Sequence, residues 1–161
     1  MGHEIERKFL VEGTAWKRGR DGRHFRQGYL NTAKERTVRV RTEGERAVLT
    51  VKGPTLGVTR QEFEYAIPWA DATRMLDHLC ERPLIEKTRY RVPVGRHTWD
   101  VDEFHGENDG LIVAEIELAS ESEPFDRPSW LGREVSGDPR YFNANLIARP
   151  YRSWARDAST P

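Results

Sequence analysis

The sequence has one cysteine, no excess of either charge and no long apolar run, and each of these features excludes a class of protein. Cys80 alone cannot form an internal disulfide or a cysteine-based metal centre, which suits a reducing compartment. The 26 basic and 26 acidic residues cancel, so no long-range field would draw the whole molecule to nucleic acid or to an acidic membrane. The amino-terminal residues include acid where a secretory signal needs apolar residues. We therefore expect a soluble, cytoplasmic protein.

The length of 161 residues is enough for one hydrophobic core and too short for two ordinary domains. Charged residues make up 32% of the chain and hydrophobic residues only 37%. This composition is polar for a compact fold unless part of the charge serves a purpose in the interior. We expect a single domain over residues 1–161.

Short segments in which apolar and charged residues alternate are the main secondary-structure signal. This period is expected when one face of a strand packs and the other does not. With a further strand expected over residues 24–30, about eight strands are present, enough to close an antiparallel barrel. The other seven lie around residues 4–11, 38–41, 49–52, 62–65, 87–92, 99–102 and 115–118.

Two segments predict amphipathic helices that would cover the outside of the barrel. Residues 68–81 place apolar side chains on one stripe. The members of this stripe are Ala72, Met75, Leu76, Leu79 and Cys80. A second helix is expected to begin at Asp138, followed by proline at its first turn. Its buried face would hold Phe142, Leu146 and Ile147. Residues 121–133 are expected to form a loop, and residues 157–161 a frayed tail.

The polar faces of these strands carry like-charged residues in i, i+2 pairs. A solvent-facing sheet normally sets opposite charges across from each other, because like charges directly opposed destabilise it. Acidic pairs suit a hard divalent cation, and basic pairs suit phosphate. A single pair is more often a solvated strand face, but repetition across separate strands favours a site for a polyanion and metal. The acidic pairs are Glu4/Glu6, Glu62/Glu64 and Glu115/Glu117, and the basic pairs are Arg39/Arg41 and Lys87/Arg89.

The run from His3 to Val11 resembles the E-x-E-x-K signature that opens the CYTH family, the triphosphate tunnel metalloenzymes. Further similar segments follow in order at residues 27–30, 39–41, 52–53, 60–64, 87–89, 99–104 and 114–118. The resemblance covers about residues 3–150. It implies a mainly β fold, an eight-stranded antiparallel barrel with a few covering helices, whose interior binds a triphosphate.

The resemblance also implies a role for each matching residue. The metal ligands would be Glu4, Glu6, Glu62, Glu64, Asp102, Glu115 and Glu117, holding Mg²⁺ or Mn²⁺ in a two-ion arrangement. Phosphate oxygens would be held by Lys8, Arg39, Arg41, Lys52, Lys87 and Arg89, with Arg133 a further candidate at the tunnel mouth. Tyr29 matches a tyrosine that would modulate access in some members, with a packed strand aromatic as the alternative. No dedicated general base is evident.

Substrates differ within this family, so several activities stay open. Small members without an attached helical domain resemble inorganic triphosphatases, and hydrolysis of inorganic tripolyphosphate is our first expectation. The alternatives are a nucleoside or thiamine triphosphatase, a class IV-type adenylate cyclase, and a non-catalytic polyphosphate-binding module. A nucleic-acid-binding sheet is disfavoured, because the interleaved acids would repel a phosphate backbone. We expect a small polyanionic substrate as partner, neither nucleic acid nor membrane, and leave a homodimer open.

Overall fold

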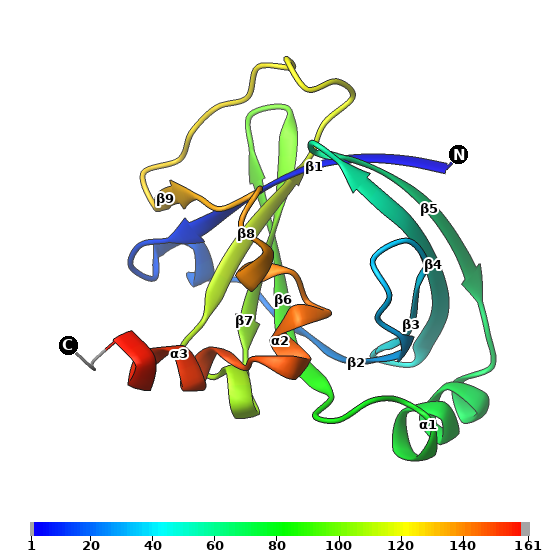
Figure 1. Ribbon diagram of the computed structural model, residues 1–161. Coiled ribbons are helices and arrows are strands. Elements are labelled where there is room, and N and C mark those ends of the chain that lie inside the picture. Colours follow the sequence, from blue (N-terminus) through cyan, green and yellow to red (C-terminus); the bar gives the residue numbers. More distant parts are fainter. Residues whose placement is uncertain (1, 159–161) are drawn as a thin grey trace.

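The computed structural model describes the backbone of residues 2–158 and the side chains of residues 5–154. Figure 1 shows the arrangement of its elements. The strands are β1 (Gly2–Val11), β2 (Arg23–Asn31), β3 (Thr37–Glu43), β4 (Arg46–Leu56), β5 (Thr59–Ala66), β6 (Ile85–Val94), β7 (His97–Phe104), β8 (Ile112–Glu117) and β9 (Leu131–Glu134). The helices are α1 (Trp69–His78), α2 (Asn145–Ala148) and α3 (Tyr151–Ala158), with short 3₁₀ turns η1 (Ala15–Lys17), η2 (Gly106–Asn108) and η3 (Pro139–Tyr141).

Strands β1 to β8 form a closed antiparallel barrel, which confirms the predicted eight-stranded fold (Figure 1). Closure depends on β1, because its two halves pair with different neighbours. Residues 2–5 pair with β5, and residues 6–10 pair with β8. The short strand β9 pairs with the end of β1 outside this ring. The prediction of a loop over residues 121–133 is therefore wrong for its last residues, which belong to β9. This strand is too short to show alternation in the sequence, and pairing with β1 orders it.

The outer face of β1, β6, β7 and β8 is covered by loops that carry large aromatic residues. Trp16 from η1 and Trp130 from the segment before β9 are both buried there. Trp99 of β7 belongs to the same cluster, with its ring centroid 5.5 Å from Phe9 and 5.7 Å from Trp130 in edge-to-face contacts. The apolar side chains of these strands therefore pack on the outside of the barrel. The charged side chains, which alternate with them, face the barrel interior.

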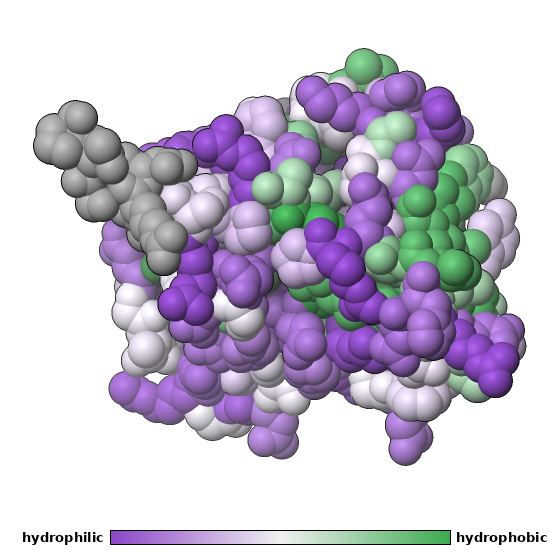
Figure 2. Space-filling model, turned by 60° about the horizontal axis from the view of Figure 1, so that its bottom comes forward, coloured by the Kyte–Doolittle hydropathy of each residue, from purple (hydrophilic) through white to green (hydrophobic). Residues whose placement is uncertain are grey.

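Helix α1 covers part of the opposite side of the barrel. Ala72 and Leu76 are fully buried against Val40 and Ala47 of β3 and β4, as the amphipathic stripe predicts. Leu79 departs from this prediction, because α1 ends at His78 and the Leu79 side chain is 67% exposed. Around α1 and β5 the surface stays partly apolar, with Phe63, Tyr65 and Trp69 exposed (Figure 2).

The carboxy-terminal segment does not form the single covering helix that the sequence predicts. Asp138 caps η3 by accepting a hydrogen bond from the backbone of Arg140, but the chain then becomes extended at Phe142 and forms the separate turn α2. Helix α3 follows directly, so part of the expected tail is helical, and residues 159–161 lie outside the described residues.

This segment lies inside the barrel instead of covering its outside. Leu146 and Ile147 pack with Ile85, Phe104 and Val113, which share the inward parity of the charged strand residues. In Figure 1 the segment, in orange, lies between the β7 and β3 sides of the barrel. It forms an apolar plug at one end of the interior, whose strand residues also include Tyr29 of β2. None of the helices in the described part of the chain is long and apolar enough to cross a membrane.

Candidate active site

A cavity of about 720 Å³ occupies the barrel interior beside the plug. Its wall is built by inward-facing residues of all eight barrel strands and by residues 136–145 before and within α2. Twelve of the predicted site residues line it. They are Glu6, Lys8, Tyr29, Arg39, Arg41, Lys52, Glu62, Glu64, Lys87, Arg89, Glu115 and Glu117. The structure thus brings together residues that are up to 111 positions apart in the sequence.

The basic wall gathers around Phe25 of β2. The guanidinium carbons of Arg41 and Arg89 lie 5.0 and 4.9 Å from the centre of this ring, within cation–π distance. Burial lowers the pKa of Arg41 to about 10, and the positive charges of Arg39 and Arg89 contribute to this decrease. The Nε atoms of Arg39 and Arg41 are buried and have no hydrogen-bond partner among the described residues. Charged donors of this kind can bind an anion.

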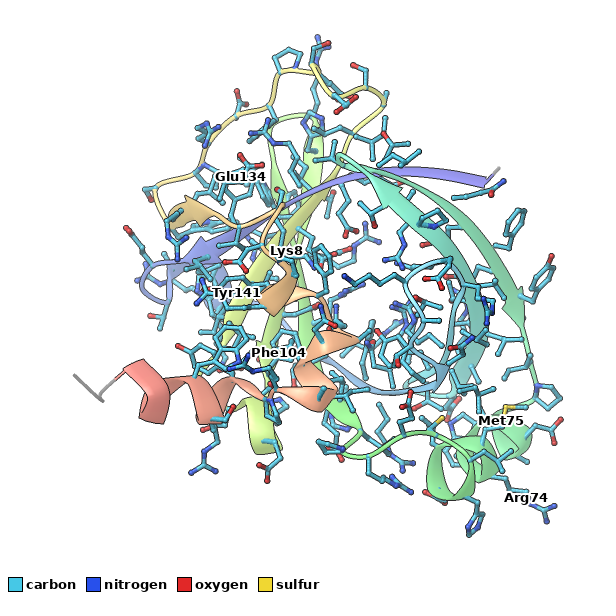
Figure 3. All side chains as sticks on the ribbon, in the orientation of Figure 1. Lys8, Arg74, Met75, Phe104, Glu134 and Tyr141 are labelled. Atoms are coloured by element: carbon cyan, nitrogen blue, oxygen red, sulfur yellow. The ribbon has the colours of Figure 1, made fainter. Side chains whose placement is uncertain are left out.

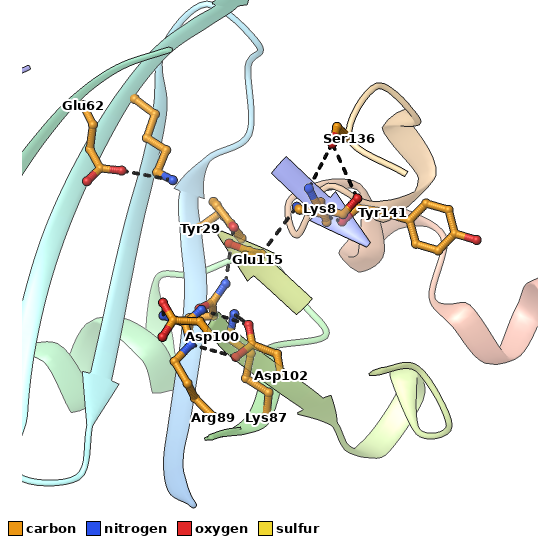
Figure 4. Close-up of polar contacts among 12 residues, drawn as sticks. Lys8, Tyr29, Glu62, Lys87, Arg89, Asp100, Asp102, Glu115, Ser136 and Tyr141 are labelled. Carbon is orange, nitrogen blue, oxygen red and sulfur yellow. Dashed lines mark hydrogen bonds and ion pairs between the residues drawn. The ribbon is translucent and has the colours of Figure 1, made fainter. Parts of the chain in front are cut away.

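The acidic wall lies across the cavity, and most of its carboxylates contact a basic residue. Glu62 forms an ion pair with Lys52 at 3.1 Å, and Glu115 lies 3.8 Å from the Lys8 ammonium (Figure 4). Glu64 lies 4.0 Å from Arg41. Glu117, at the end of β8, is exposed.

Glu115 and Glu6 lie next to each other on β8 and β1. Burial raises the pKa of Glu115, but Lys8, Arg89 and Lys87 outweigh it, and a hydrogen bond from Glu6 adds to their effect. The net result is a pKa below the ordinary value, so Glu115 is ionised. Among the described side chains no three acidic, histidine or cysteine groups converge into a preformed metal centre. The side chain of Glu4, predicted to be a metal ligand, lies outside the described ones.

Lys8 connects the acidic wall to the carboxy-terminal segment. Its ammonium donates to the Tyr141 carbonyl at 3.4 Å, and its backbone N–H donates to Ser136 Oγ at 2.9 Å (Figure 4). The Phe142 ring centre lies 5.8 Å from the same ammonium. Burial lowers the pKa of Lys8, but the carboxylates of Glu115 and Glu6 raise it to a net value above normal. Lys8 is therefore a permanent cation, and Figure 3 shows it close to Tyr141.

Two predicted residues lie outside the set that lines the cavity. Asp102 is fully buried behind the wall, where its carboxylate accepts from Lys87 Nζ at 2.8 Å and from Arg89 Nε at 2.7 Å. Arg133 is exposed on β9. Tyr29 lines the cavity and is buried in the apolar plug, as the packed-aromatic alternative expects, and a role in access stays a prediction.

Several cavity residues have no counterpart in the predicted site. Arg60 lies on the inward face of β5, with Nε donating to the Gly53 carbonyl at 2.9 Å and Nη2 to Thr37 at 3.2 Å. The sequence could have identified Arg60, because it precedes Glu62 by two residues and therefore lies on the same face of the strand. Asp100 likewise precedes Asp102. Asn143, whose amide oxygen is buried without a partner among the described residues, follows no strand period and gave no signal.

Comparison with known proteins places this geometry among proteins of one kind. Residues 2–151 match the CYTH domain. The inorganic triphosphatase of Acetivibrio thermocellus is 51% identical over 154 residues, which cover 96% of this chain and 99% of the relative. The inorganic triphosphatase of Nitrosomonas europaea is 38% identical, with coverage of 89% and 95%. The crystal structure of an inorganic triphosphatase superposes with a TM-score of 0.66 at 32% identity, over 89% of this chain and 93% of that chain.

Proposed function

The chain belongs to the CYTH domain family, and from this premise we propose that it hydrolyses inorganic tripolyphosphate to orthophosphate and pyrophosphate with the help of divalent metal. The observation that supports this most directly is the basic cluster in the cavity, in which Arg39, Arg41 and Lys87 are buried and Arg89 is largely buried. The described acids do not satisfy all of its donors. Two relatives that cover nearly the whole chain carry the name inorganic triphosphatase.

The basic side chains bind and orient the substrate in this proposal. Guanidinium groups match the oxygens of phosphate in geometry and charge, and the lysines supply point charges. Phosphoryl transfer spreads negative charge over the oxygens of the transferred group. Cations held in fixed positions stabilise that charge without having to reorganise. The apolar plug limits the entry of water at its end of the barrel.

The donor set of the acidic wall fits a divalent cation. The carboxyl groups of Glu6 and Glu115 are hydrogen-bonded to each other, and such a pair can share one proton or hold a cation between its oxygens in place of that proton. Hard cations prefer carboxylate oxygens. We propose that Mg²⁺ or Mn²⁺, as two ions, is held by Glu4, Glu6, Glu62, Glu64, Glu115 and Glu117. When bound, the metal supplies neutralisation of phosphate charge and activation of water.

The test is an assay of the purified protein with tripolyphosphate, ATP, GTP and thiamine triphosphate, each with Mg²⁺ and with Mn²⁺. We expect the highest kcat/KM for phosphate release with tripolyphosphate, and no turnover after chelation of metal. Cyclic nucleotide as the main product from ATP would replace this proposal with a cyclase. Tight binding of tripolyphosphate without turnover in either metal would replace it with a binding module.

A further inference from the structure

Both oxygens of the Asp102 carboxylate are used by neighbouring cations. Lys87 Nζ lies 2.8 Å from Oδ2, Arg89 Nε lies 2.7 Å from Oδ1, and Arg89 Nη2 donates to Oδ2 at 2.9 Å. The Asp102 side chain is 1% exposed and lies outside the residues that line the cavity. A metal ion that bound this carboxylate would compete with Lys87 and Arg89 for its oxygens.

The two cations that Asp102 holds do line the cavity. Both have long side chains with many rotamers, and the carboxylate that they share restricts the orientation of both. Phe104 and Phe25 further confine Lys87, with ring centres 5.4 and 6.0 Å from its ammonium. Asp102 also supplies the negative charge that these buried cations need, since Arg41 lies near them as a third positive group.

Asp100 lies in a different position on the same strand. It shares the inward parity of Asp102, but its side chain is 33% exposed and lines the cavity. Its contacts to cations are longer, at 3.6 Å to Arg89 and 3.5 Å to Arg91. Asp100 is also the direct cross-strand partner of Glu115 on β8, so it extends the acidic wall. Its carboxylate is therefore the one on β7 that a cation in the cavity can reach.

We infer that Asp102 is a positioning residue that holds Lys87 and Arg89 toward the substrate, and that Asp100 is the carboxylate that β7 contributes to the metal-facing wall. This inference rests on the proposed triphosphatase function. It replaces the role of metal ligand that the sequence predicts for Asp102. Strand alternation places both aspartates on the same face of β7. They differ in burial, because Asp102 is covered by Lys87 and Arg89 whereas Asp100 lines the cavity.

The experiment compares Asp102→Asn with Asp100→Asn in three measurements. These are the dissociation constant for tripolyphosphate in the presence of chelator, kcat with tripolyphosphate, and the metal concentration that gives half-maximal activity. For Asp102→Asn we expect metal-free binding to weaken about 10-fold and kcat to fall about 100-fold, because the two cations lose their alignment. Its half-activating metal concentration should stay within about twofold of the wild-type value, since the substitution leaves the acidic wall intact. For Asp100→Asn we expect that concentration to rise about 10-fold with little change in metal-free binding.

The opposite pattern would overturn the inference. If Asp102→Asn raised the half-activating metal concentration 10-fold and left metal-free binding unchanged, Asp102 would be a metal ligand. If the Asp102→Asn variant fails to fold, Lys87→Met and the double variant Asp102→Asn/Lys87→Met are compared in its place, because the double variant removes one charge of each sign. Asp102→Asn is then added to Lys87→Met and, separately, to Arg39→Met, and the further decrease in kcat is measured in each case. We expect a smaller decrease in the Lys87→Met protein, because Asp102 no longer has this lysine to hold. Equal decreases would contradict a role through Lys87. A wild-type protein that binds but does not hydrolyse tripolyphosphate would refute the proposed function and leave the metal-free comparison valid.

Discussion

Individual side chains in the cavity are placed where function has priority over stability. Arg39 is buried on β3, donates to Thr50 Oγ1 at 3.2 Å, and keeps its Nε without a partner among the described residues. A buried, incompletely paired donor costs free energy in the substrate-free protein. Such a cost is expected where a site is preorganised for an anion.

Substitution of Arg39 by methionine tests whether this arginine supports anion binding at the expense of folding stability. We expect binding of tripolyphosphate to weaken about 10- to 100-fold, since a hydrogen bond to a charged group contributes about 1.5–3 kcal/mol. The free energy of unfolding should stay constant or increase, because a desolvated charge is removed. Urea denaturation and calorimetric titration measure the two quantities. The matched control is Arg74→Met on the exposed surface of α1 (Figure 3), which should change neither. A large loss of stability in Arg39→Met would show that the arginine supports the fold.

Lys87 predicts a pH dependence of substrate binding. Burial lowers its pKa to about 8, against the opposing charge of Asp102. A bound triphosphate favours the protonated lysine and raises this pKa, so binding takes up a proton above pH 8. Metal-free affinity for tripolyphosphate should therefore be constant below about pH 7 and fall by up to 10-fold per pH unit above pH 8. In Lys87→Arg the charge persists, so the slope over this range should be much smaller. Equal slopes in both proteins would assign the effect to another group.

At the scale of elements, the carboxy-terminal segment makes two kinds of contact inside the barrel. It fills one end of the barrel with Leu146 and Ile147, and it contacts Lys8 through Ser136 and Tyr141. The apolar plug and the first strand of the site are therefore coupled.

Truncation of the plug should be costly. Leu146 is fully buried, and we expect Leu146→Ala to reduce the free energy of unfolding by about 2–5 kcal/mol. Leu79 offers a matched control, because it lies just past the end of α1 with its side chain 67% exposed. Leu79→Ala should change stability by less than about 0.5 kcal/mol. Chemical denaturation of both variants checks the prediction, and similar effects would contradict the burial of the plug.

The sequence predicted the strands and the facing of their side chains, but not the depth of those side chains in the barrel. Alternation specifies one of two faces, so Asp100 and Asp102 look equivalent although only Asp100 lines the cavity. The plug was missed for another reason. Its residues follow neither a strand nor a long helical period, since η3 and α2 are single turns whose position depends on packing against Ile85 and Phe104. A ninth strand of four residues was missed because it lacks any repeat.

For the molecule as a whole, residues of all eight barrel strands line the cavity, so ligand binding should stabilise the strands together. At a ligand concentration of 100 times the dissociation constant, binding to the folded state alone adds about 2.7 kcal/mol. For a domain of this size, 1 kcal/mol corresponds to about 2–4 °C in Tm. Tripolyphosphate with chelator should therefore raise Tm by about 5–10 °C.

This shift has an internal control. Orthophosphate at the same concentration fills only part of the basic wall and should raise Tm less, and Arg39→Met should show a reduced shift with tripolyphosphate. Differential scanning calorimetry at fixed ionic strength measures these values. Equal shifts for both anions would indicate general ion effects and count against an enclosed site.

The divided pairing of β1 has a consequence for biosynthesis. This strand leaves the ribosome before all others, yet its hydrogen-bonding partners are β5 in the middle of the chain and β8 well beyond it. Its open edges must wait unpaired while the intervening hairpins are translated, and the seam is sealed only after Glu117 has emerged. The cavity residues of β1, such as Glu6, are thus enclosed only after β8 has been made, so a nascent polypeptide that stops before β8 carries them without a closed barrel around them.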